Sequence, residues 1–447
     1  MEPDQAHAAA LAALLAPLDA LRRPLTVFAM EVHRDPEPSG EEVRTAARFA
    51  DALTAEGFTV TRGVGGHGVV GVLANGTGPR VFLRAELDAL PVREDTGLPY
   101  AADGPYMHAC GHDLHLAAVL GAASLLARGR TRWRGTLVVV GQPAEETLTG
   151  ARALLEDGLY SRFGVPDAVL AQHSAPLLAG MVAHGAGEPV LAGGVGLDVT
   201  LYGRGGHAGA PQLTVDPVPA AAAVVLRLQG IVARESAPGE RLTVTVGTLR
   251  AGTHSGVVPD RAHLGVTVRA LVPAALERAV VAVERIVRGE SAASGCPRPP
   301  EIRRVSGSPV TLPDPALTAA VGAAHRTALG AERVVPWPPS LATEDFGLYG
   351  DAGREIHGRA GVALAYWMTG VVGPRQWAAT AAAGGPAERL AALPGNHSPA
   401  FAPHLPLALP SAVTAMTAGA LAAFERDPER PSAPDPGDVA DQPPAGT

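Results

Sequence analysis

The feature that most constrains the fold is a change in the expected order of strands and helices that begins near residue 191 and ends near residue 307. Between these points the order reads β-α-β-β-α-β, with strands expected over 195–202, 241–249, 262–271 and 301–305 and helices over 216–234 and 273–288. This order is typical of a small ferredoxin-like α+β sandwich. We therefore expect an inserted domain over residues 191–307.

The flanking sequence alternates strands and helices, which predicts a layered α/β domain. Strands are expected over 80–87, 136–140 and 168–171, and helices over the first thirty residues, 41–56 (capped by Ser39), 113–128 and 314–329. A chain of 447 residues is too long for one simple core, so we expect the α/β domain to occupy residues 1–190 and 308–426. Residues 427–447 are rich in Pro, Asp and Gly and are expected to form a disordered tail.

Charge and composition exclude several classes of protein. A formal net charge of −8 gives no general attraction to nucleic acid or to an acidic membrane, and the absence of Lys excludes a Schiff-base lysine mechanism. The two cysteines, Cys110 and Cys296, are expected to remain unpaired. The start of the chain is acidic where a signal peptide is basic, and no apolar stretch is expected to reach the roughly 18 residues of a membrane span. We therefore expect a cytoplasmic enzyme with no membrane partner.

Cys110 and His112 are the strongest candidates for chemistry. They lie two residues apart just before an expected helix, and a thiolate and an imidazole at this spacing can bind one divalent ion. The alternative is a buried thiol beside hydrogen-bonded histidines. Three histidines within eight residues (His108, His112 and His115) favour ligation. His115, one helical turn beyond His112, is either an outer partner of the site or only a packed residue.

Glu145 and Glu146 follow the buried strand 136–140, at the edge of the sheet where ligands gather in α/β folds. Two adjacent buried carboxylates repel each other and need a cation or a shared proton. One of them could hold a metal ion while the other moves a proton. The alternative is a solvated turn, which the preceding Gln142-Pro143 fits equally well.

His173 and His397 are further candidates from distant parts of the chain. His173 follows a short buried strand, and His397 lies in a polar loop between apolar segments. Each histidine alone is more often structural. Two metal ions need more ligands than the three stronger candidates supply, which favours both histidines.

Asp88, together with Glu86, ends the expected strand 80–87. A carboxylate there could orient a metal-bound imidazole, or it could only cap the strand.

The segment Gly63-Val-Gly-Gly-His-Gly68 matches the G-x-G-x-x-G pattern of dinucleotide sites. Such a site requires a helix directly after the glycines, whereas residues 69–73 read as a strand. We therefore expect a hairpin turn here and no nucleotide.

With these residues placed, the chain resembles the aminoacylase/carboxypeptidase family of dinuclear metallohydrolases, and most closely its branch of hippurate hydrolase and auxin-conjugate amidohydrolases. The resemblance runs from about His33 to Phe424. Its motifs are Arg84-Ala-Glu-Leu-Asp-Ala-Leu-Pro91, Met107-His-Ala-Cys-Gly-His-Asp113, Gln142-Pro-Ala-Glu-Glu146, Gly203-Arg-Gly-Gly-His-Ala208, Glu344-Asp-Phe346 and Asn396-His-Ser-Pro399.

The resemblance implies a catalytic domain with a mixed central sheet flanked by helices, and an inserted domain that serves as a lid and for dimerisation. It implies two divalent ions per subunit, zinc or manganese first, with cobalt and nickel also compatible. The residues implied as their ligands are Cys110, His112, Glu146, His173 and His397.

The same resemblance implies roles for residues around the metals. Glu145 is implied as the general base, with Asp88 beside the metal ligands. His207, in the inserted domain, would reach the active site of a partner subunit and steady the tetrahedral oxyanion, which implies a homodimer. Arg269 matches a position that binds the substrate carboxylate.

Two positions depart from the family pattern. The usual Asn-Val-Ile-Pro is here Gly256-Val-Val-Pro259, which removes a substrate-contacting Asn side chain. The usual Asp-x-Asp is here Glu86-Leu-Asp88, a change expected to affect only the surroundings of the metal ligands.

The expected function is metal-dependent hydrolysis of the amide bond of an N-acyl amino acid or related N-acyl amine, releasing a carboxylic acid and a free amine. The lid is expected to close over the small-molecule substrate about hinges near residues 192–194 and 306–308. Three alternatives remain open. They are a dipeptidase or carboxypeptidase of the same family, a thiol hydrolase in which Cys110 is the nucleophile with His108 or His112 as its base, and a catalytically silent binding protein, which has no physical need for Glu145.

Overall fold

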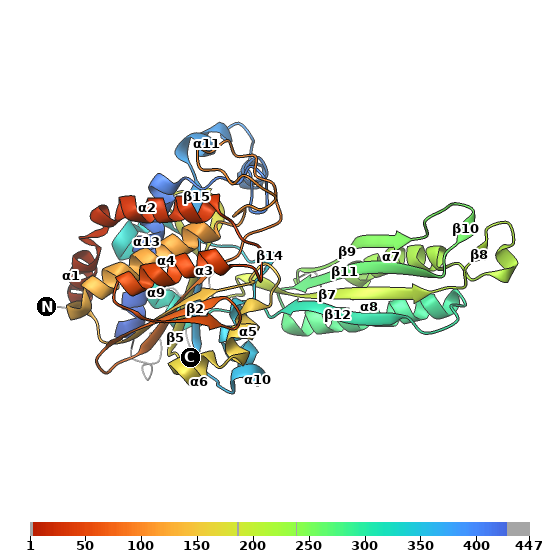
Figure 1. The fold of residues 1–447 in the computed structure, drawn as a ribbon, viewed down its shortest axis with the longest axis horizontal. Helices are drawn as coiled ribbons and strands as arrows, with labels where there is room; N and C mark the ends of the chain where they lie inside the picture. Colours follow the sequence, from red (N-terminus) through yellow and green to blue (C-terminus); the bar gives the residue numbers. More distant parts are fainter. Residues whose placement is uncertain (1–2, 186, 238, 427–447) are drawn as a thin grey trace, which may run out of the picture.

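The computed structural model describes residues 3–185, 187–237 and 239–426, which form a large lobe and an elongated smaller lobe joined by a narrow waist (Figure 1). The predicted disordered tail, residues 427–447, lies outside the described residues.

The large lobe is built on an eight-stranded mixed sheet. In spatial order its strands are β1 (Thr59–Val64), β2 (Gly68–Asn75), β4 (Gly135–Gln142), β3 (Arg80–Glu86), β5 (Ala168–Leu178), β15 (Ala363–Val372), β6 (Val182–His184) and β13 (Val334–Pro336). The four central strands, from β4 to β15, run parallel. Strands β1 and β2 are antiparallel to their neighbours, whereas β6 is antiparallel to β15 and parallel to β13. Strand β15 is buried along its whole length, as expected for a parallel strand covered on both faces.

Helices cover both faces of this sheet and create two separate cores. On one face lie α1 (Pro3–Leu15), α2 (Leu18–Arg34), α3 (Val43–Ala55), α4 (His112–Arg128), α9 (Pro315–Leu329) and α13 (Leu405–Glu425). On the other lie α5 (Gly150–Glu156), α6 (Leu159–Phe163) and α10 (Arg354–His357). Val81 and Leu83 of β3 belong to the first core and Phe82 belongs to the second, which follows the two-residue period of a strand.

The smaller lobe is the predicted ferredoxin-like sandwich. Its antiparallel sheet has the order β12 (Glu301–Ser308), β7 (Leu191–Tyr202), β11 (Arg261–Ala270) and β9 (Leu242–Ala251). Helices α7 (Pro217–Arg234) and α8 (Pro273–Ala293) pack on one face through a third core. The chain order β7-α7-β9-β11-α8-β12 confirms the predicted β-α-β-β-α-β pattern. At the far tip, β8 (Gly206–His207) and β10 (Val257–Val258) form a short ribbon (Figure 1).

The waist between the lobes consists of strand pairs. Strand β14 (Ser340–Thr343) of the large lobe pairs in parallel with the start of β7, and Leu191 also bridges to Thr311. The remaining short helices, α11 (Pro374–Ala379) and α12 (Pro386–Ala391), lie in the large lobe before the loop that carries His397.

Two local predictions near the N-terminus are wrong. The first thirty residues form two helices, because the chain breaks at Ala16-Pro17 before α2 begins. Helix α3 begins at Val43 with Glu42 before it, so Ser39 is not its cap. The Ser39 hydroxyl instead donates a 2.7 Å hydrogen bond to Asp88, which places it beside the candidate site.

The prediction that no stretch reaches the length of a membrane span is also wrong. Helices α7 and α13 are long and apolar enough by length and composition, with mean hydropathies of 1.2 and 1.6. In α13, 89% of the apolar window is buried inside the protein, where the helix packs against α4 and α9. Helix α7 packs against β9, β11 and α8. Because core helices pass the same test, this is weak evidence for a membrane span.

The predicted hairpin turn at residues 63–68 is confirmed, since β1 and β2 pair in antiparallel fashion across it. No helix follows these glycines, so the dinucleotide pattern has no structural basis. Both cysteines are free, as predicted.

Candidate metal centre and cleft

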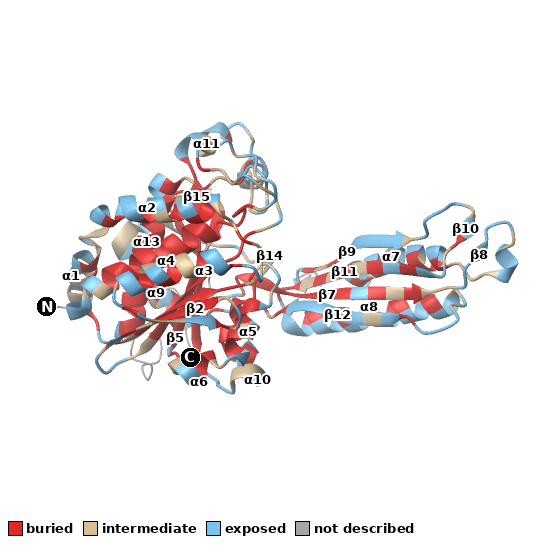
Figure 2. Cartoon of the chain, in the orientation of Figure 1, coloured by how far each residue is buried: buried red, intermediate tan, exposed pale blue. Residues whose placement is uncertain are grey.

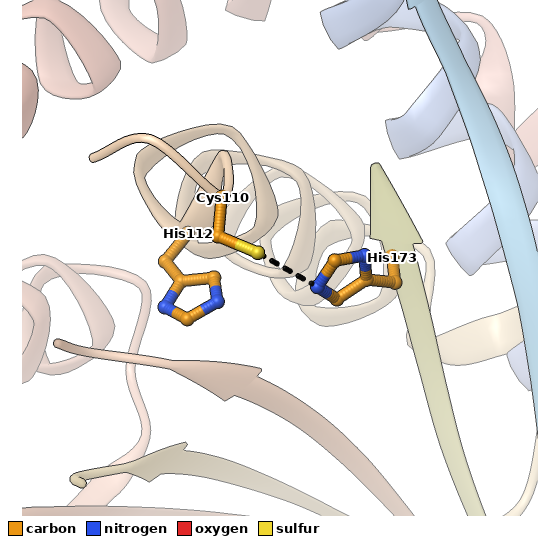
Figure 3. A group of neighbouring side chains, drawn as sticks. All are labelled: Cys110, His112 and His173. Atoms are coloured by element: carbon orange, nitrogen blue, oxygen red, sulfur yellow. Dashed lines mark hydrogen bonds between the residues drawn. The ribbon is translucent and has the colours of Figure 1, made fainter. Parts of the chain in front are cut away.

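The candidate ligands converge at the carboxyl-terminal edge of the parallel strands. Cys110 and His112 lie in the turn that opens α4, and His173 lies on β5 (Figure 3). Glu145 and Glu146 follow β4, and His397 comes from the loop after α12. Strand β5 continues to Leu178, so His173 lies within the strand and not at its end as predicted.

Cys110 is the meeting point of the cluster. Its Sγ lies 3.4 Å from Nε2 of His173 and 3.4 Å from Nε2 of His397. The two histidines are 224 residues apart in sequence (397 − 173), so the fold alone brings them to one sulfur atom. Cys110, His112 and His173 form one group of ligand atoms within 4.8 Å of one another, and Cys110, Glu146 and His397 form another.

The carboxylates of Glu145 and Glu146 lie beside the histidines of this cluster. Nε2 of His112 lies 3.7 Å from Glu145 Oε2 and 3.8 Å from Glu146 Oε1. The second oxygen of Glu146, Oε2, lies 3.5 Å from Nε2 of His397. Glu146 therefore lies between the two histidines, whereas Glu145 approaches only His112.

Hydrogen bonds to backbone carbonyls set which nitrogen of each imidazole is available. Nδ1 of His112 donates to the carbonyl oxygen of Asp88 at 2.8 Å, and Nδ1 of His173 donates to that of Ser174 at 3.0 Å. A neutral imidazole that donates through Nδ1 carries its lone pair on Nε2. Both lone pairs then face the cluster, as metal ligation requires.

Several buried atoms of this cluster lack any hydrogen-bond partner among the described residues. They are His112 Nε2, Glu146 Oε1 and Asp88 Oδ1. An unsatisfied buried polar atom costs about 1–3 kcal/mol, and more when it is charged. Soft sulfur, imidazole and carboxylate ligands together suit a divalent transition metal. The residues present therefore fit a metal centre.

Asp88 supports this centre through both ends of its carboxylate. Oδ2 accepts hydrogen bonds from the Ser39 hydroxyl at 2.7 Å and from the backbone N–H of Glu146 at 2.9 Å. Oδ1 lies 3.4 Å from Nδ1 of His112. Burial is the largest influence and raises the pKa of Asp88, but His112, the Ser39 hydroxyl and the backbone N–H of Glu146 together outweigh it, so the net pKa is lowered. The carboxylate is therefore ionised, and it holds the His112 ring and the backbone of Glu146 in position.

The acidic groups of the cluster crowd one another in the absence of a cation. Burial, followed by the charge of Glu146, raises the pKa of the Cys110 thiol to about 12. Burial raises the pKa of Glu146 to about 7, although His112 opposes the shift. The pKa of Glu145 lies well above its usual value because of burial, Glu344 and Glu146. A bound cation would favour the ionised form of each group. A thiol with so high a pKa does not suit a nucleophile.

Two unusual backbone conformations hold the ligands. Gly111, between Cys110 and His112, has φ +83°, and a Cβ there would lie 2.5 Å from the Ser174 hydroxyl oxygen. His397 has φ +69°, a left-handed conformation that is uncommon for a residue with a side chain. Its backbone N–H donates to the carbonyl of Ala109 at 2.8 Å, which ties this loop to the turn before α4.

A second group of buried residues was not assigned a role from the sequence. Arg84, on β3, is fully buried and pairs with Glu86, with Glu344 at 2.7 Å and with Asp345 at 3.3 Å. Asp345 also accepts hydrogen bonds from Gln142 at 2.8 Å and from the backbone of α5. This network joins the two sequence halves of the large lobe beneath Glu145. The sequence signal was Arg84, a charge that follows the apolar run Val81-Phe-Leu83 of this strand.

His115 proves to be an outer partner of the site. The backbone N–H of Ser174 donates to its Nε2 at 2.8 Å, so its Nδ1 donates to Glu86 at 2.8 Å. The carbonyl of Ser174 in turn accepts from His173, and from the side chain of Asn396 at 3.2 Å. His115 thus connects the Arg84 network to a candidate ligand.

The cluster opens into a cleft of about 770 Å³ at the waist between the lobes. Beyond the cluster, its lining includes Thr267 and Arg269 of β11, the hinge-side residues Gly194 and Val195, and the larger side chains Trp337, Tyr366 and Met368. Arg269 donates to the carbonyl of Leu341 at 3.0 Å, which fixes its guanidinium at the cleft. Arg269 is the only arginine among the described residues of this lining.

His207 is the one predicted site residue that its own chain does not bring to the cluster. It lies exposed on β8, at the end of the smaller lobe remote from the cleft (Figures 1 and 2).

Comparison with known proteins agrees with this geometry. Residues 82–379 match the model of Peptidase family M20/M25/M40. An IAA-amino acid hydrolase of Arabidopsis thaliana is 34% identical over 325 residues, which cover 72% of this chain and 74% of the relative. An N-acetyl-L-cysteine deacetylase of Bacillus subtilis is 35% identical over 336 residues, covering 74% and 79%. A hippurate hydrolase of Campylobacter jejuni is 38% identical over 243 residues, covering 54% and 63%.

A solved structure of a dinuclear metal-binding peptidase of the M20 family from Bacillus subtilis superposes with a TM-score of 0.70 at 26% identity. The match covers 91% of this chain and 99% of that one. The fold and the site define a metal-dependent amidohydrolase that uses divalent ions. The chain belongs to Peptidase family M20/M25/M40, as the resemblance in its motifs predicted.

Replacing Gly111 by Ala should distort the metal centre. The left-handed backbone alone costs about 1–2 kcal/mol for a residue with a Cβ, and the added methyl group would collide with Ser174. We expect a lower free energy of unfolding and a clear loss of bound metal, measured by denaturant titration and elemental analysis. The matched control is Gly358→Ala, with φ +70° and open space around its Cβ, which should lose stability but keep its metal. Equal metal content in both variants would contradict the role given to Gly111.

Metal affinity should increase with pH. Cys110, with a pKa of about 12, and Glu146, with a pKa of about 7, are raised in the metal-free protein, so both bind protons that the metal must displace. Each displaced proton strengthens apparent binding by about tenfold per pH unit while that group is still protonated. Competition with a chelator between about pH 6 and pH 8 measures the slope. An affinity that does not change over this range would remove Cys110 from the ligand set.

Proposed function

We propose that this enzyme hydrolyses the amide bond of an N-acyl amino acid, or of a related N-acyl amine, to a carboxylic acid and a free amine. The observation that carries the proposal is the convergence of five ligand-type side chains beside the buried Glu145. The names of the relatives support the substrate class, because IAA-amino acid hydrolase, hippurate hydrolase and N-acetyl-L-cysteine deacetylase all denote N-acyl amino acids.

The residues that would hold two divalent ions are Cys110, His112, Glu146, His173 and His397. Zinc or manganese suits this donor set, and cobalt or nickel is also compatible. When bound, such ions lower the pKa of water from about 15.7 towards about 7 and polarise a carbonyl oxygen. Asp88 would serve this centre by orienting His112 and the backbone of Glu146.

Glu145 is proposed as the general base and then the general acid. Its carboxylate would take a proton from the attacking water and pass it to the leaving amine. The buried position and the neighbouring Glu344 raise its pKa, which favours holding a proton between these two steps.

Arg269 is proposed to bind the carboxylate of the substrate. Its place in the cleft lining and its hydrogen bond to Leu341 give a cation that is held in position and faces the bound molecule. A planar guanidinium can bind both oxygens of a carboxylate at once.

The smaller lobe is proposed to be a lid with the boundaries expected from the sequence, residues 191–307. Rotation about residues 192–194 and 306–308 would close the cleft over the substrate and exclude water. Both segments lie at the waist, where β7 and β12 enter the large lobe (Figure 1).

A homodimer formed through the lid is proposed to complete each site. Strand β9 lies at the edge of the lid sheet and exposes Leu249. Two lids packed in antiparallel directions would carry the tip of each towards the cleft of the other. There His207 would donate a hydrogen bond to the oxyanion of the tetrahedral intermediate. We also propose a cytoplasmic location, which the two free cysteines support.

A Glu145→Gln variant should keep its metal and lose activity. Because general acid–base catalysis contributes about 10²–10⁴-fold, kcat should fall by at least about 100-fold. The measurement is amine release together with metal content. Near-wild-type turnover at full metal content would remove Glu145 from the base role.

The substrate class is tested by an amine-release assay over a panel of N-acyl amino acids and dipeptides. The metal-stripped enzyme is reconstituted in turn with zinc, manganese, cobalt and nickel. We expect N-acyl amino acids to give the highest kcat/KM and EDTA to abolish activity. Faster cleavage of dipeptides would reassign the enzyme as a dipeptidase, and activity that survives complete metal removal would overturn the metal mechanism.

A further inference from the structure

The tip of the lid carries the same local arrangement twice. His207-Ala-Gly209 and His254-Ser-Gly256 each place a histidine two residues before a glycine. In each case the backbone N–H of the glycine donates to Nδ1 of the histidine, at 2.9 Å from Gly209 and at 3.0 Å from Gly256.

In each arrangement, this hydrogen bond fixes the tautomer of the imidazole ring. A neutral imidazole that accepts at Nδ1 carries its proton on Nε2, so each ring presents an N–H donor on its other side. Both residues are exposed, and neither Nε2 makes a hydrogen bond within the described residues. The tip thus offers two matching donors held by the backbone.

Glycine at the third position of each arrangement leaves room for the histidine ring. A Cβ at Gly209 would lie 3.1 Å from the ring of His207, and a Cβ at Gly256 would lie 3.3 Å from the ring of His254. A side chain at position 256 would therefore press on the imidazole of His254. The glycine found where an asparagine was expected makes room for the histidine beside it.

The two arrangements lie together on one ribbon. His207 of β8 is paired with Val257 of β10, and the backbone N–H of Ala208 donates to the carbonyl of Gly256 at 3.0 Å. The backbone N–H of Val257 in turn donates to the carbonyl of His254 at 3.1 Å. Any molecule that reaches His207 therefore passes close to the loop of His254.

We propose that His254 is a second substrate-binding histidine, which donates a hydrogen bond from the lid tip of one subunit to the substrate carboxylate in the cleft of its partner. This inference rests on the proposed function, in which the tip delivers His207 across the dimer.

The chemistry of the cleft selects the carboxylate as the group that His254 binds. In the proposed function the metals and His207 bind the oxygen of the carbonyl under attack. The substrate carboxylate, beside Arg269, is the remaining group that could accept a hydrogen bond from His254. Among the described residues of the cleft lining, Arg269 is the only arginine, and Glu145, Glu146 and Glu344 are acidic. An added N–H donor would give the substrate carboxylate a second partner beside Arg269 and replace the missing amide side chain.

The first test separates binding from turnover in a His254→Ala variant. A hydrogen bond to a charged group is worth about 1.5–3 kcal/mol, so KM for an N-acyl amino acid should rise by about 10-fold or more while kcat changes little. For the same substrate with its carboxylate converted to a primary amide, the KM of the variant should match that of the wild type. An unchanged KM for the acid, or an equal rise for acid and amide, would overturn the proposal.

His263→Ala is the matched control, because His263 is an exposed histidine of the same lid whose Nδ1 bonds to the Thr200 side chain and not to a backbone N–H of the tip. It should leave KM unchanged. A His254→Ala/Gly256→Asn double variant supplies an amide donor in place of the imidazole and should recover part of the lost affinity. A rise in KM with His263→Ala as large as that with His254→Ala would count against a specific role for the tip.

The second test mixes subunits. Heterodimers of His254→Ala and Glu145→Gln chains contain one site with both Glu145 and a partner's intact tip, so activity at low substrate should exceed the sum of the two parents. A parallel mixture of His207→Ala with Glu145→Gln tests delivery across the dimer alone. If only the His207 mixture gains activity, the inference about His254 fails and the proposed dimer stands. If heterodimers form and neither mixture gains, the delivery of tip residues across the dimer fails.

Discussion

The whole active region depends on a cation that satisfies buried polar atoms which the protein itself leaves unpaired. Nε2 of His112 and Oε1 of Glu146 are buried without hydrogen-bond partners among the described residues. By contrast, the Nδ1 atoms of His112 and His173 are hydrogen-bonded to backbone carbonyls, which orient both rings. Unpaired atoms in so well-bonded a setting indicate a ligand that completes them. Leaving these atoms unpaired lowers the stability of the metal-free fold, and metal binding restores that stability.

Rigid support beneath the centre comes from charge pairing across the sequence. Arg84 pairs with Glu86 on its own strand and with Glu344 and Asp345 from the second sequence half of the large lobe, so both halves help to compensate its charge. A buried arginine left without these partners would be strongly unfavourable. Glu344 and Asp345 also lie next to Glu145, and together with burial they raise its pKa. The charged network that supports the fold therefore also sets the electrostatic environment of Glu145, the proposed base.

The sequence predicted the architecture because the evidence for it is periodic and local. The β-α-β-β-α-β order between two α/β segments survives errors of a few residues at each boundary, such as the longer β5 and the break at Pro17. Residues at strand ends, such as Glu146, could be placed at one edge by topology alone. The Arg84–Glu344 pair spans 260 positions, and nothing local in the sequence announces it. The roles of Asp88 and His115 remained open because they depend on which atom of each side chain faces the cluster.

The most direct test of this account is anomalous diffraction from crystals of the metal-loaded enzyme, recorded at the absorption edge of the metal. The account predicts two ions per chain, bound among Cys110, His112, Glu146, His173 and His397, with Glu145 outside their coordination. Anomalous density instead among Glu145, Glu344 and Asp345, another group of close acidic oxygens, would contradict it. So would a fully loaded crystal in which Cys110 binds no metal.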